Sequence, residues 1–336
     1  MQPPQPVRKR ITILTPVYNE EASLPLYEQT VRRTLLAHPQ YEFQVLLIDD
    51  GSIDRSWPMI LDICTRNPHF RGVRLSRNYG SHIALSAGFA HANGDAVATL
   101  ACDLQDPPEV ILAFAEQWQA GAHIVWGHRR SRADKIWRRA TSRIFFALMR
   151  RFAMPKGSAF TTGSFFLVDR KVAECFRQFQ EQNRITFALV AWTGFQQAIV
   201  KYDRQQRIAG VSGWNFRKML KTMYDAFVGF STLPIRLMTF LGVSLFILAA
   251  LLLVYVVMSW FTGEPLRGWS SVMFVVTFFF GLQFLLMGMV GEYLYRIYTE
   301  VVRRPLYFIS ERTREAEEGW KSYEEIRVSF SEHPVH

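Results

Sequence analysis

Two carboxylates in the stretch "TLACDLQDPPEVI" (residues 99–111) have the type and spacing to do chemistry. Asp103 ends an apolar run and Gln105 follows it two positions later, and side-chain oxygens of this kind bind hard divalent cations such as Mg²⁺. Asp106 stands before a proline pair, with Glu109 three positions after it, which is the spacing of a helix N-cap and a capping-box acid. The stretch therefore predicts a cation site at Asp103 and a structural role for Asp106.

Other polar residues follow short apolar runs, and each of these runs is succeeded by residues with helical spacing. Such alternation predicts an α/β domain with a mostly parallel sheet, in which ligands lie beyond the carboxyl ends of the strands. The chain contains neither GxGxxG nor GxxxxGK[ST], so it predicts neither a usual dinucleotide-binding fold nor a P-loop ATPase. The predicted strand ends carry Tyr18–Glu20, Asp49–Gly51, Arg77–Asn78 and Asp103.

Composition limits the class of protein. The 336 residues are 49% hydrophobic and 20% charged, which fits a folded chain rather than a disordered one. The three cysteines show no paired spacing typical of zinc sites or disulfide frameworks, which indicates a reducing compartment. The N-terminal "MQPPQPVRKR" lacks the apolar core of a signal peptide, so we expect no cleavage there.

The net charge of +10 is concentrated in one segment. Between Arg129 and Lys156 there are ten Lys or Arg residues and one acid, Asp134. Such an excess attracts a polyanion: a nucleic acid, an anionic membrane or a phosphorylated substrate. Phe, Leu and Met residues interleave with the arginines, which favours a membrane surface and a lipid phosphate, so we expect no nucleic acid partner.

Two long uncharged runs lie near the C-terminus. The runs cover residues 237–263 and 268–291, and each exceeds the roughly 20 residues that a helix needs to cross a bilayer. They predict a transmembrane hairpin with spans at 236–262 and 268–292; two buried core helices are the alternative. Lys and Arg on both outer flanks place both ends of the hairpin in the cytoplasm.

The rest of the chain is divided around this hairpin. We expect a cytoplasmic catalytic domain at 1–210, an amphipathic helix lying on the membrane at 211–235, and a cytoplasmic C-terminal segment at 293–336. An amphipathic helix packed on the soluble domain is the alternative for 211–235. The chain is thus predicted to be an integral membrane protein with two spans and both termini in the cytoplasm.

Six motifs occur in an order that carries a resemblance: "TPVYNEE", "LLIDDGSIDRS", "LSRNYGSHIALSAG", "DLQDPPE", "GHRRSR" and "GVSGW". Followed by two apolar runs, they resemble the polyprenyl-phosphate glycosyltransferases of glycosyltransferase family 2, a group that includes dolichol-phosphate mannose synthases and bacterial undecaprenyl-phosphate glucosyltransferases. The resemblance implies a Rossmann-like GT-A domain. It also implies transfer of a hexose, with inversion, from a nucleotide sugar such as UDP-glucose to a polyprenyl phosphate such as undecaprenyl phosphate.

The resemblance also implies site residues, a cofactor and an assembly. Asp103 and Gln105 would hold Mg²⁺ or Mn²⁺, and relatives often form homo-oligomers through their C-terminal segments. The acceptor phosphate would meet Arg129, Arg138 and Ser142. The nucleotide sugar would be lined by Pro16, Tyr18, Glu20, Asp50 and Arg77.

The chain departs from this family at two positions. Ala101 replaces the first acid of an Asp-x-Asp pair, which predicts weaker metal binding rather than its loss, because Mg²⁺ often takes one or two protein carboxylates. Ser164 stands where relatives often have an acid considered to be the base; a phosphate monoester, with a second pKa near 6, is already largely deprotonated. We therefore expect an active variant that relies on Asp103, Arg129 and Ser164.

Two alternatives to this function follow from the same residues. A catalytically weak membrane scaffold would explain Ala101 and Ser164 as signs of decay. A processive polysaccharide synthase also joins this type of domain to transmembrane helices, but such enzymes typically carry QxxRW, and in this chain no Trp follows an Arg within such a motif.

Overall fold

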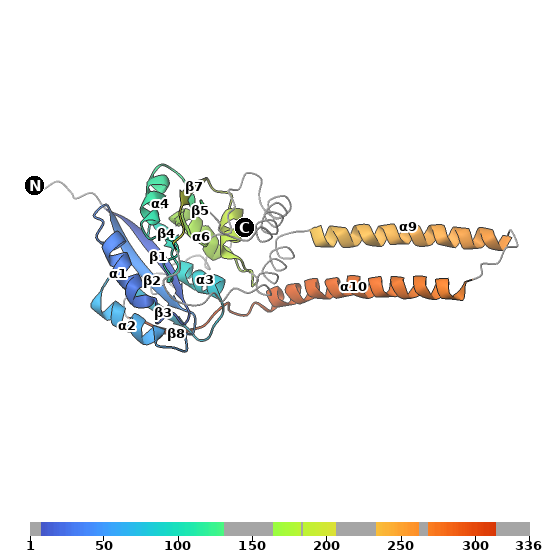
Figure 1. Cartoon of the computed structure of the whole chain (residues 1–336), viewed down its shortest axis with the longest axis horizontal. Coiled ribbons are helices and arrows are strands. Elements are labelled where there is room, and N and C mark those ends of the chain that lie inside the picture. Colours follow the sequence, from blue (N-terminus) through green and yellow to red (C-terminus); the bar gives the residue numbers. More distant parts are fainter. Residues whose placement is uncertain (1–7, 131–163, 183, 206–232, 262–267, 314–336) are drawn as a thin grey trace, which may run out of the picture.

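The computed structural model describes residues 8–130, 164–182, 184–205, 233–261 and 268–313. Within them an α/β domain carries two long helices that project from one side of it (Figure 1). The strands are β1 (Lys9–Val17), β2 (Tyr41–Asp49), β3 (Phe70–Leu75), β4 (Ala96–Thr99), β5 (Ile124–Arg129), β6 (Phe166–Asp169), β7 (Gln197–Tyr202) and β8 (Ile309–Arg312).

These strands form one sheet in the order β7-β5-β6-β4-β1-β2-β3-β8. The central run β4-β1-β2-β3 is parallel, as predicted, and β5 and β7 are also parallel to each other. Strand β6 is antiparallel to both of its neighbours, and β8 is antiparallel to β3. The carboxyl ends of β1, β2 and β4 consequently meet at one edge of the sheet.

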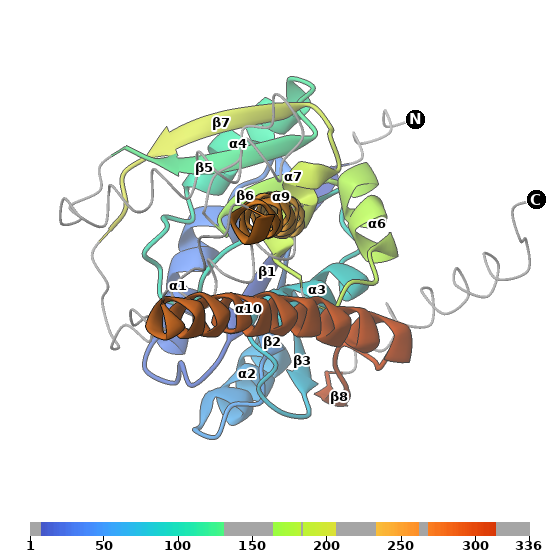
Figure 2. The ribbon, with the colours of Figure 1, turned by 90° about the vertical axis from the view of Figure 1, so that its right-hand side faces the viewer.

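Helices cover both faces of the sheet, because its central strands are apolar on both sides. One face carries α1 (Leu24–Val31), the π-helical turn η1 (Arg32–Leu36), α2 (Ser56–Arg66) and α4 (Val110–Gln119). The other carries α3 (Ser81–His91), α6 (Arg170–Gln178) and α7 (Thr186–Trp192), and Figure 2 shows these layers from the side of the projecting helices.

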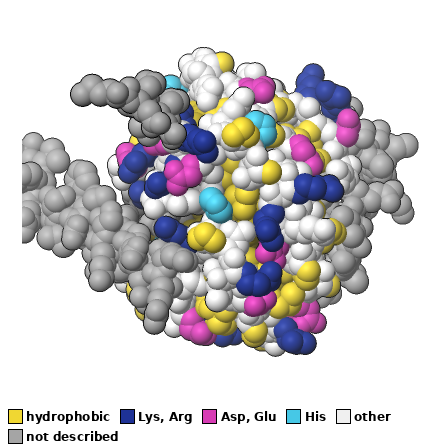
Figure 3. Space-filling model, turned by 90° about the vertical axis from the view of Figure 1, so that its left-hand side faces the viewer, with side chains coloured by type: hydrophobic (Ala, Val, Ile, Leu, Met, Phe, Trp, Pro, Cys, Tyr) yellow, Lys and Arg dark blue, Asp and Glu magenta, His cyan; other side chains and the backbone are white. Residues whose placement is uncertain are grey.

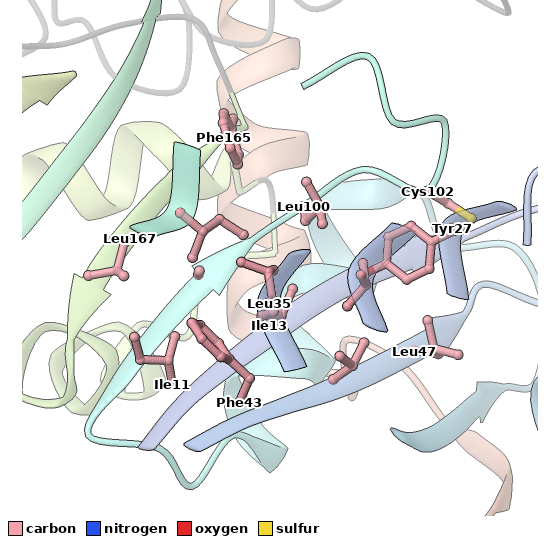
Figure 4. Packing of buried hydrophobic residues seen from close by; sticks show 14 of the residues in the cluster. Ile11, Ile13, Tyr27, Leu35, Phe43, Leu47, Leu100, Cys102, Phe165 and Leu167 are labelled. Atoms are coloured by element: carbon pink, nitrogen blue, oxygen red, sulfur yellow. The ribbon is translucent and has the colours of Figure 1, made fainter. Parts of the chain in front are cut away.

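The first of these two cores is rich in large side chains. Tyr27 of α1 is fully buried against the sheet on the side of Leu47 of β2, while Phe43 of β2 lies beside Ile11 at the other end of this core (Figure 4). Figure 4 also places Leu100 and Cys102 at the upper end of this core, where the chain leaves β4. The loop that carries Asp103 therefore starts from packed residues, which limits its movement.

The two projecting helices are α9 (Leu233–Phe261) and α10 (Trp269–Val302), and they run in opposite directions (Figure 1). Large apolar side chains stand exposed along both, including Phe240, Phe246 and Phe284. On the far side of the domain, in contrast, Lys, Arg, Asp and Glu side chains are scattered over the surface (Figure 3). Exposed apolar surface of this extent indicates contact with a lipid or protein partner.

Within the described residues, one segment is long and apolar enough to cross a membrane, Phe278–Val302 of α10. In α9 the corresponding apolar stretch is shorter, Met238–Leu248. Helices α9 and α10 thus lie where the two spans were predicted, and the candidate segment in α10 overlaps the predicted 268–292.

The C-terminal segment returns to the domain after α10. The backbone N–H of Ser76 donates to the Phe308 carbonyl at 2.9 Å, and β8 then pairs with the edge strand β3. Sequence analysis predicted a cytoplasmic C-terminal segment at 293–336; a strand paired with the chain's own sheet was not predicted.

Candidate functional site

The loops that follow β1 and β2 are joined by hydrogen bonds. The backbone N–H of Asn19 donates to Ser52 Oγ at 3.0 Å, and that of Ile53 donates back to Asn19 Oδ1 at 3.0 Å. The N–H of Glu20 donates to Ser56 Oγ at 2.9 Å. These bonds fix the loop of the first predicted nucleotide residues, where Pro16 is half-buried on β1 and Tyr18 is exposed.

Asp50 lies beside this pair of loops with its carboxylate fully engaged. Its two oxygens accept hydrogen bonds from the backbone N–H groups of Tyr79 and Gly80, both at 2.8 Å. Burial raises the pKa of Asp50. Asp50 therefore fixes the loop that carries Arg77, whose guanidinium lies 4.7 Å from the centre of the Tyr79 ring.

Gly51 allows this loop to approach. Its φ is +68°, and a Cβ built on it would lie 2.8 Å from the backbone nitrogen of Asn78 and would overlap the backbone of Arg77. Any side chain here would displace the loop of Arg77 and would also strain the backbone. The "DDG" turn is thus shaped to bring residues 77–80 against the end of β2.

Asp103 lies at the end of β4, in a turn that it stabilises itself. Its Oδ1 accepts a hydrogen bond from the N–H of Gln105 at 3.2 Å, and Leu104 between them has a φ of +50°. Burial raises the pKa of the Cys102 thiol, and the neighbouring carboxylates of Glu20 and Asp103 raise it further. Glu20, Asp103 and Gln105 are therefore brought to the same edge of the sheet.

The donors at this edge fit a cation that is shared with a substrate. Within the part of the chain that the structure describes, no group of three or more His, Cys, Asp or Glu side chains could hold a metal ion alone. Asp103 supplies one carboxylate, and Gln105 supplies a neutral amide oxygen. Such a set suits Mg²⁺ or Mn²⁺ only when diphosphate oxygens and water complete the coordination.

Asp106 has a different structural role from the one predicted. Helix α4 begins at Val110 with Glu109 as its N-cap residue, and no side chain caps it. The prediction that Asp106 caps this helix was wrong. The buried carboxylate instead accepts a hydrogen bond from Tyr202 Oη at 2.5 Å.

Two arginines complete this cluster. Arg129 Nη2 lies 3.5 Å from Asp106 Oδ1, and Arg204 Nε lies 3.6 Å from the same oxygen. Arg129 Nε also donates to Tyr202 Oη at 3.2 Å. Burial lowers the pKa of Arg129, but the negative charges of Asp106 and Asp103 and its bond to Tyr202 more than compensate, so the pKa is raised overall. One buried carboxylate thus holds two permanent cations near Asp103.

Ser164 reaches the same edge through its backbone. Its carbonyl accepts a hydrogen bond from Thr99 Oγ1 at the end of β4. Ser164 itself is exposed. Arg138 and Ser142, the other predicted phosphate ligands, lie outside the described residues.

Sequence analysis missed Tyr202 and Arg204. Tyr202 is the last residue of β7 and Arg204 follows two positions later, in the run "KYDR"; polar residues after an apolar strand were the signal that revealed the other loops. The backbone N–H of Gln205 donates to the Gln105 carbonyl at 3.0 Å, which ties this strand end to the Asp103 turn.

The family of the chain follows from its relatives. Residues 12–177, which contain most of the site, match the model of glycosyl transferase family 2. An uncharacterized glycosyltransferase of Synechocystis is 36% identical over 305 residues, which is 90% of this chain and 95% of that protein. The chain belongs to glycosyl transferase family 2. It is a glycosyltransferase, as the motifs predicted.

Further members of the family are similar over nearly their whole length. A prophage-derived bactoprenol glucosyl transferase of Shigella flexneri is 35% identical over 307 residues, covering 91% of this chain and 99% of that protein. A prophage bactoprenol glucosyl transferase homolog of Escherichia coli K12 is 33% identical over 305 residues, covering 89% and 98%. A mannosyltransferase structure from Pyrobaculum calidifontis aligns with 58% of this chain and 55% of its own at 19% identity, with a TM-score of 0.43.

Proposed function

We propose that this glycosyltransferase moves glucose from UDP-glucose to a polyprenyl phosphate, with inversion at the anomeric carbon. Relatives named bactoprenol glucosyl transferases, similar over about nine-tenths of this chain, support this choice of sugar and acceptor. The observation that carries the proposal is the Asp106 cluster, in which Arg129 and Arg204 lie near Asp103. A reaction between two phosphorylated molecules needs permanent cations at this place.

The donor occupies the loops at the ends of β1, β2 and β3 in this proposal. Pro16, Tyr18, Glu20 and Arg77 line it, while Asp50 holds the Arg77 loop in place. Asp103 and Gln105 would hold a divalent cation, which offsets the charge of the diphosphate when it is bound. Weaker metal affinity than in relatives with two acids follows from Ala101.

Arg129 and Arg204 hold the acceptor phosphate, together with Arg138 and Ser142. The phosphate is largely a dianion at neutral pH, so its oxygen attacks the anomeric carbon without a protein base. As that bond forms, the bond from the anomeric carbon to the diphosphate oxygen breaks and UDP leaves with the bonding electrons. The residues therefore act by placing two anions together, and Ser164 needs no acid–base role.

We further propose that α9 and α10 form a membrane hairpin with the predicted spans, 236–262 and 268–292. The catalytic domain at 1–210 and both termini would lie in the cytoplasm, with 211–235 on the membrane surface and copies joined through 293–336. The exposed apolar side chains of both helices support contact with lipid.

Mass spectrometry of the lipid product tests the function. Purified enzyme in liposomes is given undecaprenyl phosphate and, separately, UDP-glucose, UDP-galactose, UDP-N-acetylglucosamine and GDP-mannose. We expect polyprenyl-phosphate hexose only with UDP-glucose. A product from another donor would contradict the choice of sugar, and binding of UDP-glucose without any product would favour the scaffold.

A further inference from the structure

Three charged residues form one row across the edge of the sheet. In the strand register, Asp49 of β2 pairs with Arg74 of β3, and Arg74 pairs with Glu311 of β8. Arg74 Nε lies 3.2 Å from Asp49 Oδ2, and its Nη1 lies 2.7 Å from Glu311 Oε1. Residues that are paired in this way point to the same face of a sheet, so the row alternates acid, base and acid.

The inner end of this row holds the loop proposed to bind the donor. Asp49 is completely buried, and its Oδ1 accepts a hydrogen bond from the N–H of Ser52 at 3.2 Å. Arg74 Nη2 donates to the carbonyl of the same serine at 3.2 Å. Since Ser52 Oγ also accepts from the N–H of Asn19, one residue joins the row to both donor loops.

The outer end of the row belongs to the C-terminal strand. Each carboxylate oxygen of Glu311 has a donor of its own: Arg74 for Oε1 and Trp57 Nε1, at 2.9 Å, for Oε2. The Arg74 guanidinium also lies 5.8 Å from the centre of the Trp57 ring. These two bonds lower the pKa of Glu311. The Arg74 side chain is 30% exposed, so without Glu311 its guanidinium would keep its polar contacts with Asp49 and Ser52 and its stacking on Trp57, and would lose its closest ion pair.

Strand β8 follows closely on α10. Six residues, 303–308, separate the end of α10 from β8, and near that end Glu300 Oε1 accepts a hydrogen bond from the N–H of Gln182 at 2.8 Å. The row therefore lies between the long helix and the donor loops. A shift of this helix end has a short path of direct contacts to Ser52.

We propose that Glu311 is a positioning residue for the donor site: through Arg74 it fixes the Ser52 loop, so that affinity for the nucleotide sugar depends on contact with the C-terminal strand. The inference rests on the proposed function, which makes the Ser52 loop part of the UDP-glucose site. It assigns to the last described strand a role in donor binding, 259 residues after Ser52 in sequence (311 − 52).

Titration calorimetry and kinetics on the full chain in detergent test this proposal, with UDP-glucose as the probe. For Glu311→Gln we expect Kd and KM for UDP-glucose to rise about fivefold or more, at the low end of usual couplings between sites. We expect kcat and the KM for polyprenyl phosphate to stay within about twofold of wild type, because the acceptor cluster is untouched. Glu311→Asp, which keeps the carboxylate, should recover part of the affinity.

Glu174→Gln is the matched control, because Glu174 has a similar exposed pair with Arg170, far from the site. It should leave all constants unchanged. By reciprocity, UDP-glucose should slow amide hydrogen exchange at 309–313 in wild type and less so in Glu311→Gln. If the Kd of Glu311→Gln for UDP-glucose is unchanged, whether or not kcat and the melting temperature fall, the role of Glu311 is overturned and the proposed function is not. Failure of the wild type to bind UDP-glucose overturns the proposed function.

Discussion

Tyr202 donates its hydroxyl hydrogen to Asp106 at 2.5 Å, although the two residues are 96 positions apart in the chain. The bond brings the end of β7 to the loop after β4, and with it come two arginines. Burial and the adjacent carboxylate raise the pKa of Tyr202, so the phenol stays neutral and keeps donating at any physiological pH. Asp106 therefore accepts one hydrogen bond, from Tyr202, and forms ion pairs with Arg129 and Arg204.

Asp106→Asn should damage both the fold and the acceptor site. The amide cannot balance Arg129 and Arg204, and removing a hydrogen-bonded charge of this kind lowers the free energy of unfolding by about 1.5–3 kcal/mol. We expect a lower melting temperature and a lower kcat/KM for polyprenyl phosphate. Asp203→Asn is the control, because Asp203 forms an exposed pair with Arg130 and should be nearly neutral. Equal effects of the two variants would contradict the cluster.

Arg129→Ala and Arg204→Ala should each impair transfer far more than Ser164→Ala. Loss of one cation that stabilises developing charge lowers kcat by roughly a hundredfold. The acceptor phosphate is already largely deprotonated, so Ser164 has no proton to take from it. Steady-state kinetics with saturating donor would measure this ranking. The reverse ranking would restore an acid–base role for Ser164.

Removal of divalent cations should stop transfer. Asp103 is the one carboxylate proposed to bind the cation, so Asp103→Asn should lower activity by roughly a hundredfold or more even with added Mg²⁺ or Mn²⁺. Asp62→Asn, an exposed residue paired with Arg66, serves as the control. Full activity of the purified enzyme in EDTA would show that the cation assignment is wrong.

Gly51→Ala should weaken donor binding. The new Cβ would overlap the backbone of Arg77, and we expect a loss of about 1–3 kcal/mol in stability together with a higher KM for the donor. Gly121→Ala separates the two causes, because Gly121 also has a positive φ, +104°, but has open space around its Cβ position. The Gly121 variant should lose stability without a change in KM.

Stability should fall on acidification because of His82. Burial lowers the pKa of His82 to about 4, below the usual 6.5, and its Nδ1 accepts a hydrogen bond from the N–H of Thr186. The His82 side chain binds a proton more readily in the unfolded chain than in the folded one. The contribution of neutral His82 to the free energy of unfolding is therefore complete above pH 6.5 and is lost as the pH falls toward 4. His82→Asn keeps an acceptor for the Thr186 N–H but does not titrate in this range. Between pH 7 and 4.5 its free energy of unfolding should fall by about 2–3 kcal/mol less than that of wild type. Thermal scans in detergent at both values measure the difference.

Sequence predicted the parts of this site that local pattern determines. Asp50 and Asp103 end apolar strands, and parallel strands bring such ends together wherever the loops go. Asp106 was misassigned because a helix cap and a buried counter-ion share the same short pattern, Asp followed by prolines. Which of them forms depends on Tyr202 and Arg204, and no local pattern connects residues so far apart.

Strand β8 was missed for a related reason. Its sequence "ISER" has only four residues, half of them charged, and such a run becomes a strand only when an existing edge offers hydrogen bonds. The edge is β3, more than 230 residues earlier, as the separation of 236 between Ser310 and Arg74 indicates. Glu311 could therefore be read only as a surface acid from the sequence.

Strands β7 and β8 are the two outermost strands of the sheet, and α9 and α10 lie between them in the chain. The chain therefore leaves the sheet at one edge before the helical pair and rejoins it at the opposite edge after the pair. A domain attached in this way cannot spin about a single linker. At the β8 edge only residues 303–308 separate α10 from the sheet, so this edge stays close to the end of the helix, which limits the orientations in which the Asp106 cluster can meet a lipid phosphate.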